Sequence, residues 1–232
     1  MVRPSRTRIF LALANVGLTA CVHVGHQESH PWRLFTLSPL PETEEAAVIS
    51  SPGPVRASIG VGPIHLPGYL DQDEIVTRIS ESGYTLSDSD RWAEPLEDDI
   101  ARVLARNLST LLRTDQLTLH PWPAPQRPTY QLEIEMLRFE ADTAGAAHLA
   151  AHWFLRDVTR RQTIAEKEVR LSTAAAGSST EQTVASLSKA LGDLSVVIAD
   201  AVRASVRTDL TQSVVGSGDR GGDEGDTVKP EP

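Results

Sequence analysis

Apolar and polar residues alternate in several short stretches of the chain, and this period of two predicts β-strands. The clearest case is residues 55–61, where valine, alanine and isoleucine occupy every second position. The other predicted strands are residues 33–37, 74–79, 84–86, 117–120, 130–136, 149–155 and 165–171. Short loops join the last three, so we expect them to be antiparallel neighbours in one sheet.

Two of these strands carry an irregularity in their pattern. Gly60 and Gly62 leave one face of residues 55–61 without side chains, which predicts that another backbone packs closely there. In the strand that begins at residue 130 the alternation breaks at Leu137, and Phe139 falls on the opposite parity. A β-bulge at Leu137 would explain this break.

Two longer stretches have apolar residues three or four positions apart, the spacing of a helix that buries one side. The first starts at Pro95, and acidic residues 97–99 lie in its first turn, near the positive end of the helix dipole. The second starts near Thr180, after a Ser179–Gln182 or a Ser178–Glu181 capping box. Its narrow apolar stripe fits either packing on the sheet or contact with the same helix of another subunit.

These elements predict an α+β domain over residues 33–207, in which a mainly antiparallel sheet is covered by two long amphipathic helices. Residues 208–232 are expected to form a disordered acidic tail, because the chain is rich in Gly, Asp, Glu and Pro from residue 216 onward. The acids of this tail lack the ligand spacing of a calcium-binding loop.

The first 20 residues have the features of a secretory signal peptide. Three arginines precede an apolar run at residues 9–18, and small residues stand directly before Cys21, the only cysteine of the chain. The apolar run is shorter than the roughly 20 residues that span a bilayer. This pattern predicts a bacterial lipoprotein in which residues 1–20 are removed, Cys21 is acylated with chains such as palmitate, and residues 21–32 form a lipidated tether.

The charge of the chain limits its partners. Its formal net charge is −9, and residues 1–20 carry three arginines and no acid, so removing their three positive charges leaves −12. An acidic protein of this kind is not attracted to nucleic acid or to anionic lipid. We therefore expect no nucleic-acid partner, and membrane contact through the N-terminal lipid.

Catalytic and metal-binding motifs are missing from the sequence. It contains no Gly-rich phosphate loop, no Ser-nucleophile elbow and no pair of cysteines for a metal. His148 and His152 lie on a predicted strand, where their Cα atoms would be about 13 Å apart, too far to share a zinc ion. His23, His26 and His30 lie in the tether, where adventitious metal binding is the most we expect. The sequence thus predicts a protein that is not an enzyme and has no cofactor or metal.

Short motifs spread over residues 33–205 identify a known family. They are FTL at 35–37, IGVGP at 59–63, LPGYLD at 66–71, IVTR at 75–78, RWAEPL at 91–96, RVLA at 102–105, LAAHW at 149–153 and VASLS at 184–188. In this order they resemble the PqiC-type ABC-transport auxiliary lipoproteins, the outer-membrane component of the paraquat-inducible, MCE-type intermembrane transport system. The chain departs from that pattern at residues 72–74, where Arg-Pro-Gln is expected, and at His152, where Arg is expected.

The resemblance implies a non-catalytic lipoprotein anchored in the outer membrane and facing the periplasm. Its implied partner is an MCE-domain transport protein that conducts lipid across the periplasm, and a homo-oligomeric ring is one arrangement that the resemblance allows. Val22 after Cys21 fits sorting to the outer membrane. The residues expected to contact the partner are Tyr69, Asp71, Arg78, Arg91, Trp92 and Glu94.

Other interpretations stay open at this point. Arg91 and Glu94 could form an ion pair at the helix start, and Trp92 could be buried. The chain could also be a stand-alone lipoprotein that binds a small apolar ligand, or an outer-membrane assembly factor. A deep apolar cavity in a monomer would favour the ligand-binding alternative.

Overall fold

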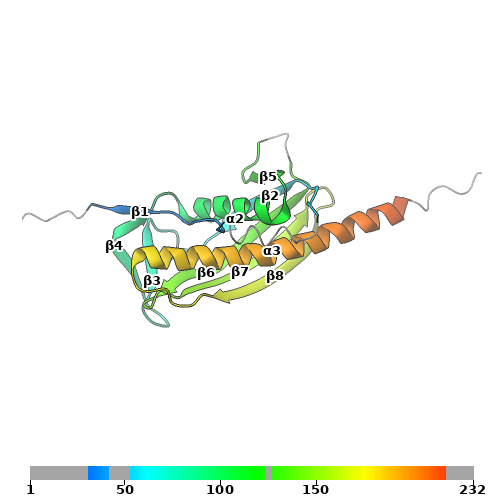
Figure 1. Cartoon of the computed structure of the whole chain (residues 1–232). Coiled ribbons are helices and arrows are strands. Elements are labelled where there is room, and N and C mark those ends of the chain that lie inside the picture. The colour runs from blue at the N-terminus through cyan, green and yellow to red at the C-terminus, as the bar shows by residue number, and fades with distance from the viewer. Residues whose placement is uncertain (1–30, 42–52, 124–126, 218–232) are drawn as a thin grey trace, which may run out of the picture. The chain divides into compact units, whose positions relative to one another are not determined.

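The computed structural model describes residues 31–41, 53–123 and 127–217 (Figure 1). Its elements are β1 (Arg33–Phe35), β2 (Ile59–His65), β3 (Glu74–Arg78), β4 (Tyr84–Trp92), α2 (Leu96–Leu112), β5 (Leu117–Leu119), β6 (Tyr130–Asp142), β7 (Ala147–Asp157), β8 (Gln162–Ser172) and α3 (Thr180–Ser217). The predicted signal peptide, Cys21, the predicted tether up to residue 30 and the end of the predicted tail lie outside the described residues. The segment expected to be tail begins at residue 208, whereas α3 continues to Ser217, so the helix ends later than the sequence predicts.

Strand β6 is the centre of the sheet. On one side it pairs along its length with β7, which pairs in turn with β8, and both pairings are antiparallel. The predicted three-stranded meander is therefore confirmed. On the other side, β2 pairs with the first half of β6, and β3 pairs with its last two residues. Strand β5 lies beyond β2, while β4 and β1 lie beyond β3.

The α+β class is confirmed, but a mainly antiparallel sheet is not, because the sheet is mixed. Among the described strands, β1 with β4, β2 with β5, β2 with β6 and β3 with β6 are parallel pairs. Parallel neighbours need a crossover rather than a tight turn. Helix α2 lies in the connection between β4 and β5, and this connection brings β5 beside β2. The apolar pattern within one strand does not show which distant strand it pairs with.

The two irregularities predicted for the strands have different outcomes. The register of β6 against β7 shifts between Met136 and Arg138, which confirms the bulge at Leu137. At Gly60 the prediction of a neighbouring backbone is wrong, since the close neighbours are side chains. A Cβ added to Gly60 would lie 2.7 Å from Pro128 Cγ and 2.7 Å from Trp122 Cζ3.

Helix α3 lies across the curved strands β6, β7 and β8, and helix α2 lies beside it (Figure 1). Helix α2 contacts β2 and β5, α3 contacts β6, β7 and β8, and the two helices contact each other. Packing of the second helix on the sheet is therefore confirmed. The largest fully buried side chains are Trp153, Phe139, Leu37, Ile59, Leu70, Ile100, Leu104, Leu108, Leu112, Leu132, Ile134 and Met136. No helix in the described ranges is long and apolar enough to cross a membrane.

Three of the helix ends have a defined local geometry. Pro95 is the N-cap residue of α2, one position before the place expected for it, and α2 ends at Arg113 with a left-handed φ of 55°. Helix α3 begins with the Ser179–Gln182 capping box. The Gln182 N–H donates to Ser179 Oγ, and the Ser179 N–H donates to Gln182 Oε1, each at 3.3 Å. Of the two capping boxes that the sequence offered, this is the one that forms.

Candidate functional site

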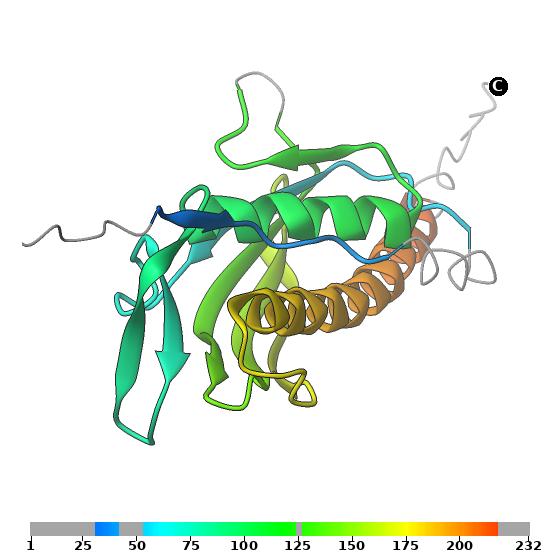
Figure 2. The same cartoon turned by 60° about the vertical axis from the view of Figure 1, so that its left-hand side comes forward.

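Residues 33–40, which we call the N-terminal segment, lie between the two helices (Figure 2). The segment starts as β1, which pairs in parallel with β4, so that Arg33 lies beside Asp90 and Phe35 beside Trp92. The Ala93 N–H donates to the Phe35 carbonyl at 2.8 Å. The first part of the segment is therefore the edge strand of the sheet.

Beyond β1, side chains of both helices accept hydrogen bonds from the backbone of the N-terminal segment. The N–H groups of Leu37, Ser38 and Leu40 donate to Asp99 Oδ2, Ser188 Oγ and Asn107 Oδ1 at 2.8, 3.0 and 2.8 Å. Two of these acceptors belong to α2 and one belongs to α3. Since an unpaired buried N–H is costly, these bonds fix the path of the segment between the helices.

Apolar packing supports the same path. Leu37 is 2 % exposed and belongs to the main core. Leu40 sits against Gly192 of α3, where an added Cβ would lie 2.6 Å from Leu40 Cδ2. Any larger residue at position 192 would therefore collide with the segment, so this glycine provides the space that Leu40 fills.

The carboxylate of Asp99 is the central acceptor for the N-terminal segment. It is fully buried, and besides the Leu37 N–H it accepts the hydroxyl of Thr36 and pairs with Arg102. Burial raises the pKa of Asp99, and the bonds from Leu37, Thr36 and Arg102 only partly oppose that effect. Its place in the first turn of α2 suggested only a dipole role, and its contact with the segment was missed.

The start of the segment is held by an ion pair. The guanidinium of Arg33 donates to both oxygens of Asp90, at 2.7 and 2.8 Å, and to Glu181 Oε1 at 2.7 Å. Asp90 is 4 % exposed, and its hydrogen bond from Arg33 lowers its pKa. These contacts connect β1, β4 and the first turn of α3. No feature of the sequence indicated that Asp90 is buried, because it lies in a polar stretch of β4 that is typical of a solvent-exposed strand.

A third buried carboxylate lies where β3 meets β6. Glu140 of β6 is fully buried and accepts the hydroxyl of Tyr69 at 2.7 Å, Arg78 Nε at 2.7 Å and Arg138 Nε at 2.5 Å. The ring of Tyr84 stacks on Tyr69 with centroids 4.5 Å apart. We call these five residues the Glu140 cluster.

The electrostatics of the Glu140 cluster keep its carboxylate ionised. Burial acts to raise the pKa of Glu140, but the hydrogen bonds from Arg78, Tyr69 and Arg138 outweigh it, and the pKa is lowered. The pKa of Tyr69 is raised by burial and by its bond to Glu140. Only two residues of β3 pair with β6, so this cluster is a main connection between the β3–β4 hairpin and the rest of the sheet.

The six residues expected to contact a partner are engaged in several separate interactions. Tyr69 and Arg78 meet at Glu140. Arg91 pairs with Glu74 at 3.2 Å, and Glu94 pairs with Arg102 at 2.9 Å, so the alternative of an Arg91–Glu94 pair does not form.

Trp92 is 7 % exposed, which agrees with the alternative that it is buried. Its backbone N–H donates to the Asp73 carbonyl at 2.8 Å. Little of its side chain is therefore available to another protein, whatever the role of its neighbours.

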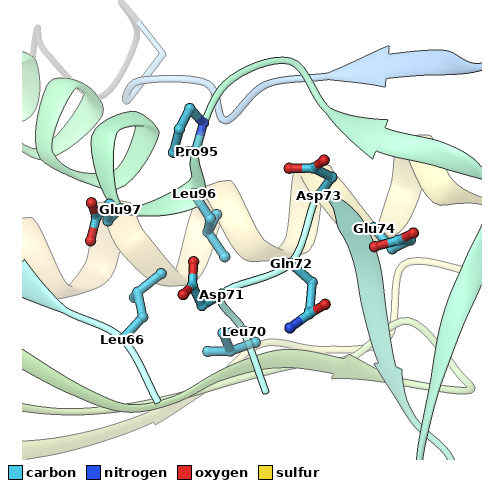
Figure 3. A pocket seen from close by; sticks show the side chains of 9 residues that line it. All are labelled: Leu66, Leu70, Asp71, Gln72, Asp73, Glu74, Pro95, Leu96 and Glu97. Carbon is cyan, nitrogen blue, oxygen red and sulfur yellow. The ribbon is translucent and has the colours of Figure 1, made fainter. Parts of the chain in front are cut away.

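Asp71 lines a cavity of about 280 Å³ between the loop after β2 and the start of α2 (Figure 3). The lining residues are Leu66, Leu70, Asp71, Gln72, Asp73, Glu74, Pro95, Leu96 and Glu97. Four of them are acidic and none is basic. A site for a small apolar ligand is lined mainly by apolar side chains, so this cavity does not support that alternative.

The two histidines of β7 are engaged separately. His148 lies 3.3 Å from Asp142 Oδ2 and 3.1 Å from Ser172 Oγ, while the ring of His152 packs on Phe154. Within residues 31–41, 53–123 and 127–217, no group of three or more His, Cys, Asp or Glu side chains is arranged to hold a metal ion. The histidines of the tether lie outside these ranges.

Comparison with known proteins gives one family and one fold. The family model described as the ABC-type transport auxiliary lipoprotein component matches residues 35–199. A crystal structure of a Xanthomonas campestris protein, described under the family DUF330, has a TM-score of 0.63 at 16 % identity, covering 77 % of this chain and 99 % of that one. Another, of an uncharacterized protein, has a TM-score of 0.59 at 18 % identity, covering 75 % and 99 %. No curated protein sequence matches the chain.

Proposed function

Since the chain belongs to the ABC-type transport auxiliary lipoprotein components, we propose that it is a non-catalytic subunit that docks the far end of a transport system at the outer membrane. The family implies a membrane-anchored protein that faces the periplasm and serves a transporter. The finer proposal is that acyl chains on Cys21 hold the domain at the outer membrane, and that its partner is a periplasm-spanning MCE-domain protein.

The observation that carries this proposal is the fixed path of the N-terminal segment. The segment begins at Arg33, twelve positions after Cys21 in the sequence. Its backbone donates to side chains of α2 and α3, and Arg33 pairs with Asp90. An anchor attached through such a segment would hold the domain itself, which is what a docking subunit requires.

For the docking contacts we propose the exposed part of the loop after β2. Asp71 is exposed, and Tyr69 beside it is only partly buried. The Glu140 cluster holds Tyr69, and with it the loop, against β6. A loop held this way presents the same shape to each partner molecule, which lowers the ordering cost of association. Arg91 and Glu94 remain proposed contacts at its margin, and subunits could repeat the loop around a ring.

Affinity capture of the native, detergent-extracted lipoprotein tests the proposal. We expect a mass spectrum with acylated Cys21 and co-purification of an MCE-domain protein. Reversing one charge in the loop, Asp71→Arg, should reduce the captured partner severalfold. Asp88→Arg makes the same change at another exposed aspartate, on β4, and should leave capture unchanged. An acylated protein that brings down no MCE-domain partner would contradict the proposal.

A further inference from the structure

The two most exposed large apolar side chains in the described part of the chain are neighbours. Trp32 is 70 % exposed and Leu34 is 64 % exposed. They are two positions apart at β1, and successive side chains of a strand point to opposite sides, so these two share one side. The alternate residues, Arg33 and Phe35, are turned to Asp90 and to the core. Strand β1 therefore has one side packed and one side bare.

Trp32 is oriented by a fixed cation. The guanidinium of Arg91 lies 5.4 Å from the centre of the Trp32 ring. Arg91 is itself held by Glu74 at 3.2 Å and by the Ser87 carbonyl at 2.8 Å. The indole is thus supported on one face and open on the rest. An aromatic side chain of this kind, apolar with one polar N–H, is favoured at the boundary between water and lipid.

Chain length keeps this patch near the predicted anchor. Eleven residue steps separate Trp32 from Cys21, and a fully extended chain covers at most about 40 Å over that number. The other exposed apolar residues, such as Ile79, Leu119 and Leu137, follow only after the chain has entered the fold. With a net charge of −12 after removal of residues 1–20, the protein is repelled by anionic lipid, which leaves a zwitterionic surface as the matching one.

We propose that Trp32 and Leu34 insert into the interface of the zwitterionic leaflet in which Cys21 is anchored. The acyl chains and this patch then form two attachment points, which fix how the domain stands on the membrane instead of leaving it free to swing. The inference rests on the acylation of Cys21 in the proposed function, and it adds a second contact that acylation alone does not require.

Quenching of tryptophan fluorescence by brominated lipid tests the inference. The native lipoprotein is reconstituted into vesicles of phosphatidylethanolamine and phosphatidylcholine, with or without brominated acyl chains. We expect quenching in the wild type, loss of that quenching in Trp32→Ala, and a marked reduction in Leu34→Asp, which keeps the indole but makes insertion unfavourable. Leu137→Asp changes another exposed leucine, on the bulge of β6, and should quench as the wild type does.

Three outcomes would overturn the inference. Acylated Cys21 without brominated-lipid quenching refutes it and leaves the proposed function standing. Trp32 that is shielded from aqueous iodide but not quenched by lipid means that a second copy or a protein partner covers the patch. A native protein with a bare Cys21 thiol refutes both the inference and the proposed anchoring, so the two failures are distinguishable.

Discussion

Asp99 and Glu140 are both fully buried carboxylates, yet they serve their regions in opposite ways. Asp99 accepts a backbone N–H and a hydroxyl from the N-terminal segment and has one guanidinium, Arg102, which is about half exposed. Glu140 has two guanidinium partners, Arg78 and Arg138. Burial raises the pKa of Asp99, whereas the partners of Glu140 lower its pKa.

The difference shows how each region depends on charge. The β3–β4 hairpin is attached through an ionised carboxylate that pairs with two arginines, so losing that charge removes the ionic partner of two partly buried cations. Beyond the ion pair of Arg33 at its start, the N-terminal segment is attached through neutral donors and apolar side chains, which need an acceptor at Asp99 but not a charge. Four substitutions distinguish these two kinds of attachment. The loss in the free energy of unfolding that we expect is largest for Glu140→Gln and smallest for Asp99→Asn.

Glu140→Gln should lower the free energy of unfolding by about 4 kcal/mol, because it removes the charge that pairs with two arginines in a buried site. Urea unfolding measures the loss. The matched control is Glu135→Gln, which changes an exposed glutamate of the same strand and should alter the free energy of unfolding by less than about 0.5 kcal/mol. A loss below about 1 kcal/mol would mean that the Glu140 cluster does not secure the hairpin.

Leu37→Ala should lower the free energy of unfolding by about 3 kcal/mol, because it removes a side chain that is 2 % exposed from the core. Leu34→Ala, three residues earlier in the same segment but 64 % exposed, should cost less than about 0.5 kcal/mol in the same urea titration. Equal effects for the two variants would show that the segment is not packed between the helices.

Asn107→Leu should lower the free energy of unfolding by about 2 kcal/mol, because the partly buried N–H of Leu40 loses its acceptor. Arg106→Leu, on the exposed side of the same turn of α2, is the control. Hydrogen exchange gives a sharper measure, since the Leu40 amide should lose protection in Asn107→Leu while the β6–β7 amides keep theirs. Unchanged protection of Leu40 would contradict the role assigned to Asn107.

Asp99→Asn should have the smallest effect, about 1 kcal/mol or less near pH 7, because the amide oxygen still accepts the Leu37 N–H. The pH dependence gives the contrast. The pKa of Asp99 in the folded state is raised above 3.8. Asp99 therefore contributes most to the free energy of unfolding below pH 3.8, and this contribution is lost as pH rises through the folded-state pKa.

Glu140 has the opposite dependence on pH. Its folded-state pKa lies below 4.5, so its contribution is present above pH 4.5 and is lost as pH falls through the folded value. From about pH 6 to about pH 3, the stability advantage of wild type should therefore grow over Asp99→Asn and shrink over Glu140→Gln in urea titrations. The same trend for both variants would refute the contrast between the two carboxylates.

The sequence predicted what local periodicity controls. The meander of β6, β7 and β8, the bulge at Leu137 and the Ser179–Gln182 capping box all follow from residues close together in the chain. The parallel pairing of β2 and β3 with β6 could not be predicted this way. The paired residues lie 64 to 71 positions apart in the sequence, and their pairing depends on the path that the loops and α2 take between them.

The buried carboxylates were missed for a related reason. Glu140 follows Glu133 and Glu135 in the same strand, and the residue type alone does not distinguish the fully buried glutamate from the two that keep some exposure to solvent. One available clue was that Arg138 and Glu140 are two positions apart after the bulge and so share one face of the strand. The family motifs that contain Tyr69 and Arg78 were another clue. The motifs predict Tyr69 and Arg78 to be partner contacts, whereas the structure places both around Glu140, a position that also serves the fold.

The direction of β1 has a mechanical consequence. It runs parallel to β4, and the N-terminal segment then continues between α2 and α3 (Figure 2). A pulling force directed along this strand would strain its bonds to the sheet and to both helices in shear, at the same time. Strands peeled apart from one end lose their bonds one after another, at much lower force. The way the chain enters this fold therefore makes the body hard to tear from whatever holds its N-terminus.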